Sequence, residues 1–449
     1  MNDALETLWL RMKWNAAMYA AIPRQRRLPY LPEEQIREVR DARLRETVQY
    51  AALTVPFYRD WFRREGVSPQ QIRTLADVAR LPVVEKEMVR AQPELFRSTS
   101  PLGRRAEPFI TSGSSGLRAT IFHDPRSLLA NLAYGERLRA AIAHFTGGAV
   151  GKREAWIGYR GSMTGDMWAF QRRWAIVPVR YDRLFLSILD PLEDLIRAVN
   201  SYRPNVIFGF GAYLEMLFKV VAERKLSLHL PQLIVYGSEA MTLEGRRFIE
   251  ERFGVPVLSD YGAVESFKIG FLCEARTTFH LHEDLCAVRI VDERDRELPE
   301  GESGAMLISN LVNRGTVLLN YRLGDVAGIS SSDCPCGRRL PLLSTFGGRA
   351  NDDLFVPDGR FIHFTAIWMV LKTCPDVLSH QLVQHETGRF ELRLVTVDRA
   401  TFDSVAAETA RRVEGVLGKG TSVEPTFHER ILPGIGGKFR PVVALPRAE

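Results

Sequence analysis

Two short apolar runs constrain the fold more than any other feature of this chain. Residues 205–209 (NVIFG) and 233–237 (LIVYG) each end at a glycine, and helical stretches separate them. Apolar runs of this length bounded by glycine are typical of strands buried in a parallel sheet. The pattern therefore predicts an α/β domain in this part of the chain.

The segments on either side predict further parts. Residues 1–95 have helical spacing with short breaks, and helices are expected to open at Pro32 and at Ser68. Residues 287–291 and 305–309 flank a Gly-containing turn and predict hairpin strands of a smaller β-rich subdomain. Beyond residue 353, short strands and two helices predict a compact α+β unit. We expect a large N-terminal domain over residues 1–347, a hinge over 348–353 and a small mobile domain over 354–449.

Composition excludes some classes of protein. The chain has 449 residues, and its 60 Lys and Arg against 54 Asp and Glu give a net charge of +6, a mild bias that is not the footprint of a nucleic-acid-binding protein. Small anionic substrates suit it equally well. Five cysteines are too few for a secreted disulfide framework, so a reducing, cytoplasmic location is expected.

The N-terminal residues have the spacing of an amphipathic helix, with apolar side chains at Leu5, Leu8, Trp9 and Met12. A basic segment follows, so such a helix could lie on an anionic membrane surface. Packing against the large domain is the more usual fate of an amphipathic helix, and no uncharged run approaches the length of a membrane span. Membrane contact is therefore not expected.

A run of hydroxyl and glycine residues lies at 111–118 (TSGSSGLR). Glycines let backbone N–H groups converge on phosphate oxygens, and Ser and Thr hydroxyls add further donors. The run lacks the Lys and the spacing of a Walker P-loop. Taken alone it is also compatible with an ordinary turn between strands.

Six short motifs occur in a fixed order along the chain, the sixth of them near the C-terminus. The ordered set identifies a protein family more specifically than any single motif does. The motifs are Thr111–Gly116, residues 236–239 (YGSE), 260–265 (DYGAVE), 321–325 (YRLGD), 348–352 (GRAND) and 436–440 (GGKFR). The ordered set resembles the adenylate-forming superfamily, and within it the branch of phenylacetate–CoA ligases and CapK-like proteins. The resemblance covers roughly residues 35–445.

The resemblance implies an ATP-dependent carboxylate ligase that forms an acyl- or aryl-AMP and transfers the acyl group to coenzyme A. The alternative is transfer to a carrier-protein thiol, an amine or a hydroxyl, because the sequence after the hinge departs from the phenylacetate-type continuation. A non-catalytic adenylate-binding scaffold is disfavoured because it has no chemical need for both Glu265 and Lys438.

The resemblance also assigns roles to residues. Lys438, Glu265 and Arg322 are the expected catalytic residues, with Glu265 as the Mg²⁺ ligand and Lys438 bridging carboxylate and α-phosphate. Val264 stands where the family has Thr, and Ser266 could replace the missing hydroxyl. The residues expected to bind ATP or AMP are Thr111, Ser112, Gly113, Ser114, Ser115, Gly116, Gly237, Ser238, Glu239, Asp260, Tyr261, Gly262, Asp325 and Arg349.

Four further residues have the composition of a metal site: Cys273, His280, Cys334 and Cys336. Three thiolates and one imidazole complete a tetrahedron suited to structural Zn²⁺, and the phenylacetate–CoA ligase branch shows a similar pattern. Buried free cysteines are the alternative. A two-metal hydrolase site at residues 280–284 (HLHED) is disfavoured, because no further His-rich stretch follows.

The carboxylic acid substrate is the least determined feature. Aromatic residues gather in the region where the family places its acyl pocket and would suit a flat aryl acid, although core packing is expected for most of them. They are Trp156, Tyr159, Trp168, Phe170, Phe208, Phe210 and Tyr213. The sequence leaves open the acid, an acyl carrier protein as acceptor, and the oligomeric state, including a homodimer.

Overall fold

The structure is a computed structural model of the chain. It describes residues 3–111, 119–148, 151–158, 162–176, 182–238, 241, 243–347, 354–362, 366–367, 370–371, 374, 376–377, 379–396, 398–429, 431 and 442–443. The chain forms two compact units. The first contains Met1–Ile110, Thr120–Leu186 and Leu192–Gly348, and the second contains Thr111–Ala119, Ser187–Pro191 and Arg349–Glu449.

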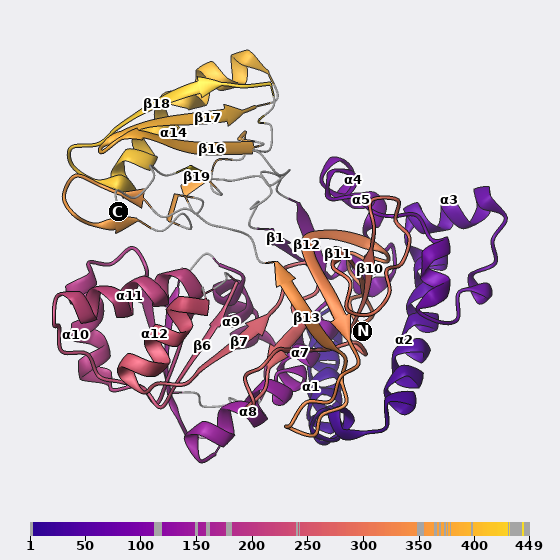
Figure 1. The fold of residues 1–449 in the computed structure, drawn as a ribbon. Helices are drawn as coiled ribbons and strands as arrows, with labels where there is room; N and C mark the ends of the chain where they lie inside the picture. Colours follow the sequence, from indigo (N-terminus) through magenta and orange to yellow (C-terminus); the bar gives the residue numbers. More distant parts are fainter. Residues whose placement is uncertain are drawn as a thin grey trace. The chain divides into compact units, whose positions relative to one another are not determined.

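Helices make up most of the first hundred residues, helices alternate with strands from there to residue 261, and strands then follow one another as far as residue 347 (Figure 1). The described helices are α1 (Asp3–Arg27), α2 (Glu33–Thr54), α3 (Pro56–Glu65), α4 (Lys86–Ala91), α5 (Pro93–Phe96), α6 (Pro101–Arg104), α7 (Pro125–Tyr134), α8 (Glu136–Thr146), α9 (Met163–Trp174), α10 (Leu192–Tyr202), α11 (Gly211–Glu223), α12 (Leu243–Phe253) and α14 (Arg399–Leu417).

The strands form one large sheet and three smaller ones among the described residues. They are β1 (Glu107–Ile110), β2 (Thr120–His123), β3 (Arg153–Gly158), β4 (Asp182–Ser187), β5 (Val206–Phe210), β6 (Leu233–Gly237), β7 (Val257–Tyr261), β8 (Gly270–Leu272), β9 (Phe279–Leu281), β10 (Cys286–Val291), β11 (Gly304–Asn310), β12 (Tyr321–Ser330), β13 (Leu342–Gly347), β14 (Leu354–Phe355), β15 (Phe361–Ile362), β16 (Ser379–Glu386), β17 (Arg389–Val395), β18 (Ser422–Phe427) and β19 (Val442–Val443).

The large sheet has the strand order β10-β11-β12-β13-β9-β8-β7-β6-β5-β3-β4. Strands β3, β5, β6 and β7 pair in parallel, which confirms the α/β prediction drawn from the two glycine-bounded runs. Strands β10, β11 and β12 pair antiparallel, as predicted for the hairpin. The β-rich part therefore continues the same sheet, joined through β13 and β9.

Helices cover both faces of the parallel strands. On one face, Leu138, Ala141 and Ile142 of α8 pack with Val206 and Val235 in a buried cluster. On the other face a Cβ added to Gly209 of β5 would lie 3.3 Å from the Leu214 side chain of α11. Both faces are thus buried, which explains why β5 and β6 are apolar along their whole length.

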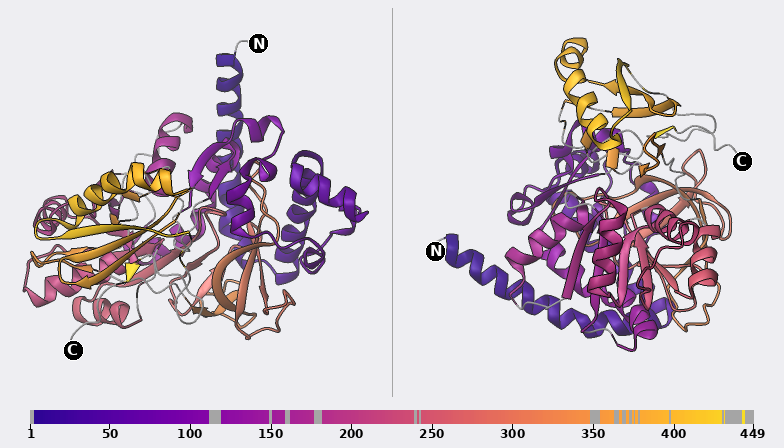
Figure 2. Two further views of the ribbon diagram at one scale, coloured as in Figure 1. Left: turned by 90° about the horizontal axis from the view of Figure 1, so that it is seen from above. Right: turned by 90° about the vertical axis from the view of Figure 1, so that its left-hand side faces the viewer.

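The N-terminal helix α1 packs through residues other than the predicted stripe. Trp14 and Met18 are buried, and the Trp14 ring lies 5.5 Å from that of Trp174. The stripe of Leu5, Leu8, Trp9 and Met12 is instead at least half exposed, and in Figure 2 the N-terminal end of α1 extends beyond the neighbouring helices. Within the described residues, no helix has the length and apolar character needed to cross a membrane.

The second unit is built on a four-stranded sheet in the order β18-β17-β16-β19, together with the β14–β15 hairpin. Strands β16 and β17 pair antiparallel, whereas β18 and β19 each add in parallel. Helix α14 buries Phe402, Ala406 and Val413 in one core with Leu392 and Leu394 of β17. This is the α+β composition expected for the C-terminal region.

Candidate active site

The carboxyl ends of β6 and β7 lie side by side, because Gly237 pairs with Asp260 in parallel register. Ligands of open α/β sheets bind at such strand ends. A Cβ on Gly237 would lie 3.0 Å from the Asp260 carbonyl oxygen, and one on Gly262 would lie 2.0 Å from the Phe267 carbonyl oxygen. Ser238 has φ of +66°, a strained value for a non-glycine residue. The two predicted adenylate-binding motifs therefore share one tightly packed edge.

Two of the predicted residues at this edge are held by hydrogen bonds. The Tyr261 hydroxyl donates to Asp325 Oδ2 over 2.6 Å, which joins β7 to β12. Lys268 Nζ donates to Asp260 Oδ2 over 2.6 Å. Nothing in the motifs pointed to Lys268. Its eight-residue separation from Asp260 is closed only by the turn that follows β7.

Glu265 lies in the turn after β7, with 5% of its surface exposed. Its Oε1 accepts a hydrogen bond from the Tyr321 hydroxyl over 3.0 Å, and its carbonyl oxygen accepts one from Asn310 Nδ2 over 2.9 Å. A buried carboxylate needs such partners or a cation. The predicted Mg²⁺ ligand is therefore rigidly held by β12 and the end of β11.

The turn is also tied to β2. His123 Nε2 lies 2.7 Å from the Val264 carbonyl oxygen, and the His123 ring packs 4.2 Å from that of Phe267. Burial lowers the pKa of His123 to about 3, so the ring is neutral at neutral pH and its Nε2–H donates to Val264. This side chain anchors the start of the Glu265 turn.

Arg322 contacts two carboxylates in this structure. Its Nε donates to Glu85 Oε1 over 2.9 Å, and its Nη2 bonds to Asp295 Oδ1. Burial lowers the pKa of Arg322, but the hydrogen bonds to Glu85 and Asp295 and the charges of these two groups together outweigh burial and raise the pKa above its usual value. Glu85 and Asp295 thus fix a predicted phosphate-side cation in place.

Thr111 closes the base of the glycine-rich segment. Its N–H donates to the Ala119 carbonyl oxygen over 3.0 Å, and its Oγ1 accepts from the Ala119 N–H over 2.9 Å. Several predicted site residues lie outside the described residues: Ser112, Gly113, Ser114, Ser115, Gly116, Glu239, Arg349 and Lys438. Their roles stay predictions.

A cavity of about 230 Å³ opens along the face of the parallel strands. Trp156, Trp168, Phe208 and Phe210 line it. The Trp156 and Phe208 rings are stacked, with centroids 4.3 Å apart and an angle of 6°. Part of the predicted aromatic set therefore forms a flat-walled cavity.

Other members of the aromatic set are placed elsewhere. Phe170 and Tyr213 are buried, with Phe170 in the cluster around Trp14. They are core residues, as expected for most of the set. Tyr159 lies outside the described residues.

Charged residues also line this cavity. Arg183 Nε donates to Glu154 Oε2 over 2.7 Å, and Arg139 Nη1 lies 3.9 Å from Glu154 Oε1. The Arg183 guanidinium carbon lies 5.1 Å from the centre of the Trp168 ring. Nothing in the sequence pointed to this group, since its members come from α8, β3 and β4 and carry no motif.

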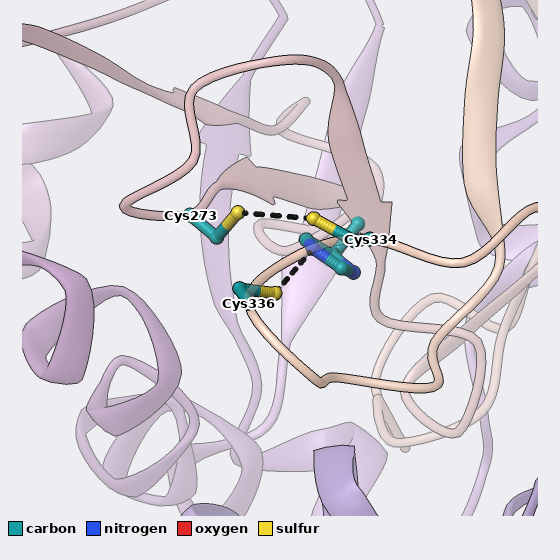
Figure 3. Close-up of side chains that lie close together, drawn as sticks. Cys273, Cys334 and Cys336 are labelled. Atoms are coloured by element: carbon teal, nitrogen blue, oxygen red, sulfur yellow. Dashed lines mark hydrogen bonds between the residues drawn. The ribbon is translucent and has the colours of Figure 1, made fainter.

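The four residues of the predicted metal site lie together (Figure 3). Cys273 follows β8, His280 lies in β9, and Cys334 and Cys336 lie in the turn between β12 and β13. The ligand atoms are all within 4.8 Å of one another, with 3.6 Å between the sulfurs of Cys273 and Cys334 and 3.3 Å from Cys336 Sγ to His280 Nε2. Four ligands around a Zn²⁺ with Zn–S bonds of 2.3 Å would be about 3.8 Å apart.

The surroundings of the cluster suit a bound cation with neutral imidazole. Burial, and then Arg338, lower the pKa of His280 to about 4. Arg338 itself makes a bidentate pair with Glu274, both bonds being 2.8 Å. His282 belongs to a different group, because its Nδ1 lies 3.1 Å from Nη1 of Arg137. This placement separates the two histidines of the disfavoured hydrolase hypothesis.

Comparisons with known proteins agree with the motifs. No protein-family model matches the chain. Phenylacetate-coenzyme A ligase of Thermus thermophilus is 26% identical over 374 residues, which is 82% of each chain. The ligase of the same name from Escherichia coli is 25% identical over 337 residues, 72% of this chain and 73% of the other.

Solved structures share the fold. 2-Hydroxyisobutyryl-CoA ligase in complex with 2-HIB-AMP and CoA superposes with a TM-score of 0.62 and 20% identity, covering 93% of this chain and 92% of that one. The same ligase in its postadenylation state gives a TM-score of 0.61. The predicted resemblance and fold class are confirmed.

Proposed function

We propose that this chain, a homologue of the phenylacetate–CoA ligases with the adenylate-forming fold, is an AMP-forming ligase that converts a small carboxylic acid into its coenzyme A thioester. The observation that carries the proposal is the shared edge of β6 and β7, where Gly237 pairs with Asp260 and the aromatic-walled cavity opens. The named relatives favour coenzyme A over a carrier-protein thiol as acceptor.

The reaction has two half-reactions. A carboxylate oxygen of the acid attacks the α-phosphorus of ATP, and pyrophosphate leaves. The thiol of coenzyme A then attacks the acyl carbon of the adenylate, loses its proton, and AMP leaves. Both steps develop charge on oxygen, so the residues at this edge act by positioning and by electrostatic stabilisation.

We assign the adenosine end to β7 and β12. Asp325 accepts from the ribose hydroxyls, and the Tyr261 hydroxyl, which donates to Asp325 over 2.6 Å, fixes that carboxylate. A Cβ on Gly262 would lie 2.0 Å from the Phe267 carbonyl oxygen, so the turn that follows Tyr261 and carries Glu265 requires glycine at this position.

Glu265 is the proposed ligand of Mg²⁺. Its burial and its bond from Tyr321 hold one carboxylate oxygen, which leaves the second oxygen for a cation. When bound, Mg²⁺ neutralises charge on the phosphates. Asp260 points to a similar need, because its Oδ1 is buried without a hydrogen-bond partner among the described residues.

A structural Zn²⁺ is proposed at Cys273, His280, Cys334 and Cys336. Two of the ligand separations are 3.3 and 3.6 Å and all four ligand atoms lie within 4.8 Å of one another, which suits four ligands gathered around one tetrahedral ion. We expect about one zinc per chain in protein purified without chelator, and loss of that zinc in Cys336→Ala. Cys374→Ala is the matched control, because Cys374 is a buried thiol outside the cluster. Absence of zinc from the parent protein would overturn the assignment.

The test of function is a panel of aryl and short-chain carboxylic acids assayed for pyrophosphate release from ATP, with and without coenzyme A. At least one acid should release pyrophosphate, and coenzyme A should convert a slow release into continuous turnover with thioester as product. Continuous turnover with an amine acceptor but not with coenzyme A would instead identify an amide-forming ligase.

A further inference from the structure

Resting on the function proposed above, we infer that the preferred substrate is an aryl carboxylic acid bearing a hydroxyl group at the end of the ring farthest from its carboxylate. The juxtaposition that carries this is the aromatic cavity with Glu154, Arg183 and Arg139 on its wall. The inference names the substrate class of the same site, and its three parts are the depth, the walls and the inner end of the cavity.

The register of the parallel strands gives the cavity its depth. On the face that α8 covers, Gly237 of β6 aligns with Asp260 of β7 at the strand edge. Val235, two residues before Gly237 in β6, aligns with Phe208 of β5, which in turn aligns with Trp156 of β3. Another two residues earlier, Glu154 aligns with Val206. Each two-residue step along a strand is about 7 Å. Glu154 therefore lies about two steps below the edge at which adenylation is proposed.

The walls at the middle level are flat and aromatic. Trp156 and Phe208 are stacked, and Trp168 meets Trp156 edge-on with centroids 5.3 Å apart. An acid with its carboxylate at the strand edge would hold a single ring against these side chains, since one step separates the two levels. The far end of that ring would then reach the level of Glu154.

The inner end is polar and charged, yet mostly shielded from water. The side chains of Glu154, Arg183 and Arg139 are 8%, 16% and 20% exposed. An unsubstituted ring would displace water from these three charged side chains and could not replace the hydrogen bonds that the water makes. That loss would cost binding free energy. A substrate with a polar end therefore fits this wall better than an unsubstituted hydrocarbon ring.

Charge balance favours a hydroxyl over a second carboxylate. Glu154 and Glu136 offset Arg183 and Arg139, since Arg139 Nε lies 3.5 Å from Glu136. Arg26 also reaches Glu136, but its side chain is 59% exposed and screened by solvent. A hydroxyl donates to the Glu154 carboxylate, which has acceptor sites beyond the Arg183 bond, and accepts from a guanidinium. An anionic end group would meet Glu154, and the described residues of this wall supply no net positive charge to receive it.

The experiment measures kcat/KM for pyrophosphate release with phenylacetate, 4-hydroxyphenylacetate and 4-carboxyphenylacetate. The hydroxylated acid should exceed the unsubstituted one by about 10- to 100-fold, the range for one or two hydrogen bonds to charged groups. In Glu154→Gln and Arg183→Met this ratio should fall towards one. Arg197→Met is the control, because Arg197 lies on α10 with its side chain 76% exposed and does not line the cavity. Its ratio should equal the parent's.

The ratio compares two acids on the same protein, so partial misfolding of a variant does not mimic the effect. A preference for phenylacetate or for 4-carboxyphenylacetate, or a ratio that neither substitution changes, would overturn the inference while leaving the ligase function intact. Failure of every acid in the broader panel to release pyrophosphate would instead overturn the proposed function, and the inference with it.

Discussion

At the residue scale, Glu265 gives the sharpest test of the proposed metal ligand. Glu265→Gln keeps an oxygen to accept the 3.0 Å bond from Tyr321 but removes the charge. The Mg²⁺ concentration for half-maximal adenylation should rise at least about tenfold, because even outer partners of a bound metal have effects of that size. The measurement is pyrophosphate release titrated with Mg²⁺.

Tyr321→Phe is the matched control for Glu265. It keeps the carboxylate and removes one hydrogen bond, so it should cost about 1 kcal/mol of stability and raise the half-maximal Mg²⁺ concentration less than Glu265→Gln does. If Glu265→Gln retained the parent's Mg²⁺ dependence, another residue would hold the ion.

The sequence predicted the positions of some site residues and missed others. The motifs of β6, β7 and β12 lie close together, since Gly237 pairs with Asp260 and the Tyr261 hydroxyl donates to Asp325. Lys268, Glu154 and Arg183 were not predicted. Their contacts join separate elements, such as the bond from Arg183 to Glu154 across 29 residues, and no local pattern encodes such a pairing.

At the element scale, the bond between β2 and the Glu265 turn predicts a pH dependence of stability. The pKa of His123 is lowered from 6.5 to about 3 by burial. Above pH 6.5 His123 is neutral in both the folded and unfolded states. Below pH 6.5 only the unfolded state takes up the proton. The free energy of unfolding therefore decreases as the pH is lowered, by up to about 1.4 kcal/mol per pH unit, until about pH 3.

His123→Gln isolates this contribution, because the amide still offers an N–H to the Val264 carbonyl oxygen but does not titrate. We expect parent and variant to differ by a constant free energy of unfolding at pH 7 and 8, and the parent to lose more than the variant between pH 6.5 and 5. Urea titrations at these pH values measure the difference. Parallel curves throughout would show that His123 takes up its proton in the folded protein.

Helices and strands were predicted best where the hydrophobic pattern of a segment is uniform or strongly periodic. Runs 205–209 and 233–237 became β5 and β6, because uniform apolar character suits strands covered on both faces. The helix predicted from Pro32 begins at Glu33 and extends to Thr54. The helix predicted after Ser68 is only a 3-10 turn over Pro69–Gln71, and a second 3-10 turn follows over Ala76–Arg80. The stripe of α1 was assigned to packing, but Trp14 and Met18 carry that contact instead.

At the scale of the whole molecule, we propose that the region after residue 353 rotates between the two half-reactions about the segment 348–353. Lys438 cannot both contact the α-phosphate and leave a path for an incoming thiol in one arrangement, and rotation of a domain resolves that conflict. Lys438→Ala should slow adenylate formation by about 10²- to 10³-fold and leave thioester formation from supplied acyl-adenylate largely intact.

Lys419→Ala is the matched control for this prediction, because Lys419 is an exposed lysine of the same unit with no assigned role. It should leave both half-reactions at the parent's rates. Equal loss of both half-reactions in Lys438→Ala would contradict the division of labour. Asp352→Pro, which fixes φ within the proposed hinge, should impair thioester formation more than adenylate formation.

The central claim, that the acid is activated as an acyl-adenylate, is tested most directly with a substrate acid whose two carboxylate oxygens are ¹⁸O. Attack on the α-phosphorus and thiolysis of the acyl group leave one carboxylate oxygen on the nucleotide. Mass spectrometry of the products should therefore find one ¹⁸O in AMP for each thioester formed. The label in inorganic phosphate, with ADP as the nucleotide product, would show activation through an acyl phosphate and contradict the account.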